Sequence, residues 1–169
     1  MGFFISLNIE FCEVEEAPRS KNNTFESIII KLPQKITSDV ILGSIYRPPA
    51  GSIPAFTSDF EPLLNYLTKT NKKLFIAGDF NINLLKFDHH LQTSNFLNTL
   101  ASFKLIPVIL RPTRITEFTF TLIDNIYTNS NQKMDSCILV EDISDHFRGV
   151  TTIGAAGARH RGPRPPGAH

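Results

Sequence analysis

Residues 73–81 read KLFIAGDFN, and this stretch decides the fold class. Its apolar centre, residues 74–77, has the length and composition of a short buried strand. Gly78 is expected to end that strand, and Asp79 follows just past its carboxyl end. The stretch therefore predicts a strand that delivers an acid, Asp79, and an amide, Asn81, to one end of a sheet.

Two strands and a helix are predicted before this stretch. Residues 25–32 and 40–46 are rich in β-branched and apolar side chains and predict an antiparallel pair joined by a loop at 33–38. Apolar residues at 60, 63, 64 and 67 form one helical stripe. Ser58 and Glu61 have capping-box spacing, so we expect the helix to begin near Ser58. Pro62 fits only a first turn, which leaves the start of the helix defined to within a few residues.

After the central stretch, a second helix is predicted over 93–103 and an extended segment over 105–110. A basic loop follows at 111–114, then a strand at 118–127 that contains Asp124, and a last strand at 137–140. Residues 144–146, SDH, come next in a turn. This order of strands and helices predicts an α/β layered domain built on mixed sheets.

The length of 169 residues indicates one domain. We expect a poorly defined segment over 1–23, the domain over 24–150 and a disordered tail over 151–169, in which residues 154–169 include no large apolar side chain. Four basic residues of the tail can be read as a nucleic-acid contact, although a nonfunctional appendage is favoured: Arg159, His160, Arg161 and Arg164.

Composition excludes several classes of protein. The net charge of +1 does not by itself indicate a nucleic-acid-binding protein. Contacts with nucleic acid would have to come from local patches of basic residues. Cys12 and Cys137 have no paired spacing, which disfavours a zinc site or a disulfide and fits an intracellular setting. No apolar run has the roughly 18 residues of a membrane helix, and no signal peptide is indicated.

Three short segments carry the chemistry: GDFN at 78–81, IDNI at 123–126 and SDH at 144–146. Hydrolysis of a phosphodiester needs an activated water, neutralised phosphate oxygens and a stabilised leaving oxygen. Carboxylates can accept the proton of water or hold Mg²⁺, and a protonated His beside an Asp can donate to developing charge. Each segment alone is more often a turn, a helix cap or a structural histidine, so only the set of three indicates a site.

Together with YRPP at 46–49, these segments resemble the endonuclease/exonuclease/phosphatase superfamily, and within it the apurinic-type endonuclease domain encoded by non-LTR (LINE-type) retrotransposons. The resemblance covers about residues 24–148. It implies a four-layer α/β sandwich, two mixed β-sheets flanked by helices, here incomplete. It also implies Mg²⁺-dependent cleavage of a DNA phosphodiester inside the cell, and in the nucleus if the protein is functional.

The resemblance assigns roles to the first half of the site. Tyr46 would contact the scissile phosphate. Asp79 would align or deprotonate the attacking water. Asn81 would bind phosphate beside it.

The resemblance also assigns the second half. Asp124 would orient His146, and His146 would stabilise the charge of the transition state. Asp145 would assist the metal or the water. Arg111 and Arg114 would meet the DNA backbone, the alternative being a solvated loop.

Two departures from the family pattern lower the expected activity. The family begins with strands that carry a metal-linked Asn and a metal-binding Glu, and residues 1–23 do not match them. Residues 147–150 also leave the pattern. We therefore expect a truncated domain with weak or no nuclease activity. Two alternatives stay open: an active phosphoesterase of the same superfamily on another substrate, and a non-catalytic nucleic-acid-binding remnant. The oligomeric state is not indicated.

Overall fold

The computed structural model describes residues 2–34, 39–70, 72–131, 135–139 and 148–152, with side chains as far as residue 131. The predicted site residues Asp145 and His146 lie outside the described residues, as does the tail from residue 153 onward. No helix in the described part of the chain is long and apolar enough to cross a membrane.

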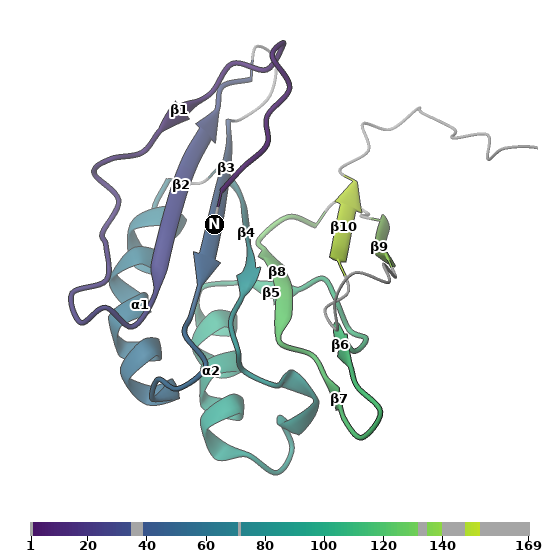
Figure 1. Cartoon of the computed structure of the whole chain (residues 1–169). Helices are drawn as coiled ribbons and strands as arrows, with labels where there is room; N and C mark the ends of the chain where they lie inside the picture. The colour runs from purple at the N-terminus through teal and green to yellow at the C-terminus, as the bar shows by residue number, and fades with distance from the viewer. Residues whose placement is uncertain (1, 35–38, 71, 132–134, 140–147, 153–169) are drawn as a thin grey trace, which may run out of the picture.

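A six-stranded mixed sheet forms the centre of the molecule (Figure 1). Its strands run in the order β1-β2-β3-β4-β8-β5, and only the β3–β4 pair is parallel. The bounds are β1 Cys12–Glu13, β2 Glu26–Leu32, β3 Val40–Tyr46, β4 Lys73–Asp79, β8 Asp124–Thr128 and β5 Ile106–Pro107. The predicted pair β2–β3 and the predicted strand at 74–77 are confirmed, and β1 adds a short edge strand from the polar N-terminal segment.

Helix α1, Ile53–Thr68, crosses between the parallel strands β3 and β4. The predicted start at Ser58 is wrong, because the helix begins one and a half turns earlier. The side chain of Ser52 caps it by accepting the N–H of Ala55 at 3.3 Å. Pro62 therefore lies inside the helix, at an exposed position.

Helix α2, Leu91–Ser102, agrees with the prediction to within two residues at its start, and the 3₁₀ helix η1, Leu84–Lys86, precedes it. Both α-helices pack on the same face of the main sheet and form one core with it. Buried aromatic rings join the two layers: Phe80 contacts Phe96 of α2 and Tyr127 of β8 at centroid distances of 6.1 and 4.9 Å. The core therefore lies between the helices and one sheet face.

The predicted strand at 118–127 is divided into β7, Phe120–Thr121, and β8. The N–H of Leu122 donates to the Asn83 side chain at 3.0 Å, and that of Ile123 donates to Thr113 Oγ1 at 3.2 Å. In a continuous strand, these two N–H groups would donate to the backbone of a neighbouring strand. Because they donate to side chains, the β-ladder is interrupted between β7 and β8. Sequence periodicity does not show such long-range partners.

Two small antiparallel sheets lie beyond β8 (Figure 1). One pairs β6, Arg114–Ile115, with β7, and the other pairs β9, Asp135–Leu139, with β10, Arg148–Thr152. The α/β fold class is confirmed. A mixed sheet with helices on one face and two small sheets at its side corresponds to a partial α/β sandwich.

Gly78 lies inside β4 and does not end it, contrary to the prediction. Its Cα approaches the neighbouring strand so closely that an added Cβ would come within 1.8 Å of the backbone oxygen of Ile45. Only glycine fits at this position. The strand consequently continues to Asp79, which stands in direct register with Tyr46 of β3.

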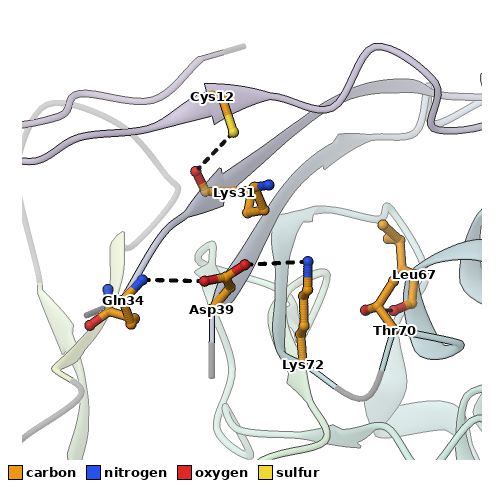
Figure 2. Close-up of polar contacts among 7 residues, drawn as sticks. All are labelled: Cys12, Lys31, Gln34, Asp39, Leu67, Thr70 and Lys72. Carbon is orange, nitrogen blue, oxygen red and sulfur yellow. Dashed lines mark hydrogen bonds and ion pairs between the residues drawn. The ribbon is translucent and has the colours of Figure 1, made fainter. Parts of the chain in front are cut away.

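An ion pair joins β3 and β4 at the opposite end of the two strands (Figure 2). Asp39 precedes β3 and Lys72 precedes β4, and their side chains form an ion pair at 3.4 Å. The N–H of Gln34 donates to the same carboxylate at 3.3 Å and is the first cause of the lowered pKa of Asp39. The first residues of the two strands are therefore joined, and their last residues, Tyr46 and Asp79, lie side by side.

Candidate active site

Three predicted site residues form a row across adjacent strands of the main sheet. Tyr46 on β3 is the register partner of Asp79 on β4, and Asp79 is the register partner of Asp124 on β8. Directly paired residues project from the same face of a sheet. The row lies on the face opposite the helices, because the residues that alternate with it, such as Ile45, belong to the core.

An open pocket of about 400 Å³ lies at this end of the sheet. Its lining residues come from three neighbouring strands: Glu26, Ser44, Ile45, Tyr46, Gly78 and Asp79. Glu26 extends the row by one strand, since it is the register partner of Tyr46. Sequence reasoning missed Glu26 because it lies at the start of an apolar strand, far from the acid clusters, and only strand pairing brings it to the site.

The turn after β4 fixes Asp79 and Asn81 relative to each other. The Asp79 carboxylate accepts the N–H of Asn81 at 3.0 Å, and this contact folds the chain back on itself. Asn81 has a φ of 49°, in the left-handed region that asparagine tolerates better than most residues. Its side-chain amide donates to the carbonyl of Arg47 at 2.7 Å, which leaves the second amide hydrogen for a ligand.

Thr113 connects the basic loop to Asp124. Its buried hydroxyl oxygen accepts the N–H groups of Ile123 and Asp124 at 3.2 and 3.1 Å. The flanking Arg111 is exposed and Arg114 half-buried, so both arginines are held beside the end of β8. The sequence placed this loop before the Asp124 strand, and the structure adds the threonine that joins the two.

The structure brings together Tyr46, Asp79, Asn81 and Asp124, with the arginine loop at their side. It does not address Asp145 and His146, which lie outside the described residues. Within residues 2–131, apart from 35–38 and 71, no group of three or more His, Cys, Asp or Glu side chains is arranged to hold a metal ion.

Comparison with known proteins identifies the family. A family model described as endonuclease-reverse transcriptase matches residues 40–148, which include every predicted site residue. No protein among the curated sequences matches the chain.

Solved structures show the same fold. The endonuclease domain of TRAS1, a telomere-specific non-LTR retrotransposon, is 16% identical with a TM-score of 0.70, over 90% of this chain and 72% of that domain. Endonuclease/exonuclease/phosphatase family proteins from Beutenbergia cavernae DSM 12333 and Leptotrichia buccalis C-1013-b are each 16% identical, with TM-scores of 0.53 and 0.51. The chain spans 38% and 52% of their lengths and 74% of its own in both cases. With its partial sandwich, its strand-end acids and the matching family model, the chain belongs to the endonuclease-reverse transcriptase family.

Proposed function

We propose that this chain carries the water- and phosphate-binding side of a DNA-nicking phosphodiesterase, the endonuclease part of a non-LTR retrotransposon protein acting in the nucleus. One observation supports this above all. Tyr46, Asp79 and Asp124 stand in direct register on the open face of the sheet, next to a pocket of about 400 Å³. A phosphodiester placed in the pocket would meet the Tyr46 hydroxyl and the Asp79 carboxylate, with Asp124 on the next strand.

Each residue of the row has a chemical task in this proposal. The Tyr46 hydroxyl donates to a non-bridging phosphate oxygen. Asp79 uses the carboxylate oxygen not engaged by the N–H of Asn81 to orient the attacking water and accept its proton. Asn81 offers its second amide hydrogen to the phosphate. These contacts hold water and phosphate in line for attack.

The remaining roles fall on Asp124 and on the two residues outside the described part. Asp124 orients His146, and the imidazolium of His146 stabilises charge on the phosphate. Mg²⁺, with Asp145 as a ligand, would neutralise phosphate charge when bound. Since the described residues do not form a metal site, we assign no step to the metal and propose that this chain alone nicks DNA weakly or not at all.

The β6–β7 hairpin supplies a DNA contact beside the row. Arg111 and Arg114 flank Thr113, and the hairpin carries the exposed aromatic side chains of Phe118, in its turn, and Phe120, on β7. Arginine is the usual partner of phosphate oxygens, and exposed aromatic rings offer surfaces on which bases stack. The chain has a net charge of only +1, so DNA affinity would depend on this local surface.

A binding experiment tests the DNA partner. Fluorescence anisotropy of a labelled duplex, measured across a salt series, should show that Arg111→Ala reduces the salt slope of the logarithmic affinity by about 1. Lys69→Ala removes another exposed positive charge, at the carboxyl end of α1, and serves as the control. Equal slopes for both variants would remove the loop from the DNA surface.

A nicking experiment tests the reaction. Supercoiled plasmid with added Mg²⁺ should show at most slow nicking, and Asp79→Asn should abolish what there is. Robust nicking that is lost in Asp79→Ala and His146→Ala would contradict the proposed weak activity. Release of phosphate from small esters without nicking would instead favour a phosphoesterase acting on another substrate.

A non-catalytic role is the second candidate, because the described residues lack a group of three metal ligands. In that case the chain is a nucleic-acid-binding remnant of the family. DNA binding that is independent of Mg²⁺, with no cleavage of plasmid or small esters, would distinguish this role from a weak nuclease.

A further inference from the structure

Arg47 is a fully buried cation next to the site, and none of the roles above uses it. It follows Tyr46 at the end of β3, and its side chain is 1% exposed. Burying a charged group is unfavourable unless the group is paired and hydrogen-bonded. A buried guanidinium at this position therefore needs a structural reason.

The guanidinium group contacts the turn that carries the site. Nη1 donates to the carbonyl oxygens of Phe80 and Asn81 at 3.4 and 3.2 Å, and Nη2 donates to that of Gly51. The group also lies over the ring of Phe56, 5.8 Å from its centroid. Its donors thus connect the loop after β3 with the turn after β4.

The backbone of Arg47 also forms hydrogen bonds with the same turn. Its N–H donates to the carbonyl of Asp79 at 2.9 Å, and its carbonyl accepts the side-chain amide of Asn81 at 2.7 Å. Arg47 therefore contacts every residue from Asp79 to Asn81. Such multiple contacts explain how Asn81 is held at a φ of 49° without support from a regular element.

Electrostatics agree with this geometry. Burial lowers the pKa of Arg47, and the nearby negative charge of Asp79 opposes that shift. The positive charge is therefore stabilised by the same carboxylate whose turn it holds. Lysine would keep the charge but not the planar fork that reaches several carbonyl groups at once.

We propose that Arg47 is a positioning residue, whose buried guanidinium fixes the turn 79–81 so that the Asp79 carboxylate and the Asn81 amide stay in place at the pocket. Its effect on catalysis rests on the proposed function, whereas its hold on the turn does not. Arg47 acts through these two side chains and does not touch the substrate.

Nuclear magnetic resonance tests the hold on the turn without any need for activity. Arg47→Met should speed hydrogen exchange of the Asn81 side-chain amide about tenfold or more and shift its resonance, while core amides such as that of Ile76 keep theirs. In Arg47→Lys, the exchange rate of the Asn81 side-chain amide should lie between that of the unmodified chain and that of Arg47→Met. Arg111→Met, which removes an exposed arginine, should leave Asn81 unchanged. Asn81 signals that are the same in all three variants would overturn the proposal.

The unmodified chain provides a test that no folding defect can obscure. A held guanidinium gives separate, slowly exchanging Nη proton signals with nuclear Overhauser contacts to the residues 80–81. A single averaged signal without those contacts would refute the proposal even if both Arg47 variants failed to fold.

Kinetics separate positioning from binding where nicking is measurable. Arg47→Lys should lower kcat by roughly ten- to a hundredfold, since small misplacement of reacting groups has effects of that order, and should leave KM for DNA within about twofold. A rise in KM alone would contradict positioning. If neither the unmodified chain nor its variants nick or bind DNA, the proposed function is rejected. The resonance experiments then still test whether Arg47 fixes the turn.

Discussion

The two faces of the main sheet use the same strands for different purposes. On the helix side, Ile45, Leu74 and Ile76 are 0% exposed and pack against α1 and α2. On the other side, Tyr46, Asp79 and Asp124 are half-buried and polar, and they meet at one end. Because side chains alternate along a strand, stability and chemistry can be assigned to opposite faces of one element. Substitutions on the two faces should therefore have different consequences.

The largest expected effect comes from Gly78, where β4 closely approaches the backbone of Ile45 on β3. Gly78→Ala places a methyl group 1.8 Å from the backbone oxygen of Ile45, so β3 and β4 must separate. We expect a loss of about 4 kcal/mol or more in the free energy of unfolding, measured by urea denaturation. Gly51→Ala is the matched control, since its nearest contact would be 3.6 Å. Equal stability of the two variants would contradict the close approach.

Next in size are truncations that compare the faces directly. Leu74→Ala should lower the free energy of unfolding by about 2–5 kcal/mol, because it leaves a cavity beneath the helices. Leu42→Ala removes the same atoms from the half-buried opposite face and should have about half that effect or less. Equal losses would show that the second face is as well packed as the first.

A carboxylate in the helix layer offers a smaller effect with a defined pH dependence. Burial raises the pKa of Asp59, but hydrogen bonds from Ser20, Thr24 and the N–H groups of Lys21 and Asn22 outweigh it, so the pKa is lowered. The stability it contributes is then complete above the ordinary value of 3.8 and is lost as pH falls through the lower folded-state pKa.

The substitution Asp59→Asn should lower the free energy of unfolding by about 1 kcal/mol near pH 6. The difference from the unmodified chain should shrink as pH falls below 3.8, which denaturation at a series of pH values measures. A difference that does not change with pH would assign the effect to packing and not to the charge.

The smallest expected effect on stability belongs to the polar row. Tyr46→Phe should change the free energy of unfolding by only about 0.5 kcal/mol, because this side chain borders an open pocket. The same substitution should reduce DNA binding or nicking. A large loss of stability would mean that the row is structural, and the contrast between the faces would fail.

Much of the fold could be read from local patterns. The strand at 74–77, the pair β2–β3 and the helix α2 follow from β-branched runs and a 3.6-residue stripe, which depend on neighbours in sequence. The start of α1 is less clear from local patterns. Ser52 and Ser58 both precede helical positions, and each is followed within a few residues by a proline, Pro54 and Pro62. The structure uses Ser52, with Pro54 in the first turn.

The sequence alone determined the family, the α/β class and four members of the row and its turn, because Tyr46, Asp79, Asn81 and Asp124 each lie in a short motif that can be recognised in the sequence. The tertiary structure decided which of these residues face one another and what holds them. Strand register brings Glu26 to the pocket. The side chains of Arg47 and Thr113 form hydrogen bonds with backbone groups of Asn81 and Asp124. Such contacts join distant residues through main-chain groups that all residues share, so side-chain patterns in the sequence carry no record of them.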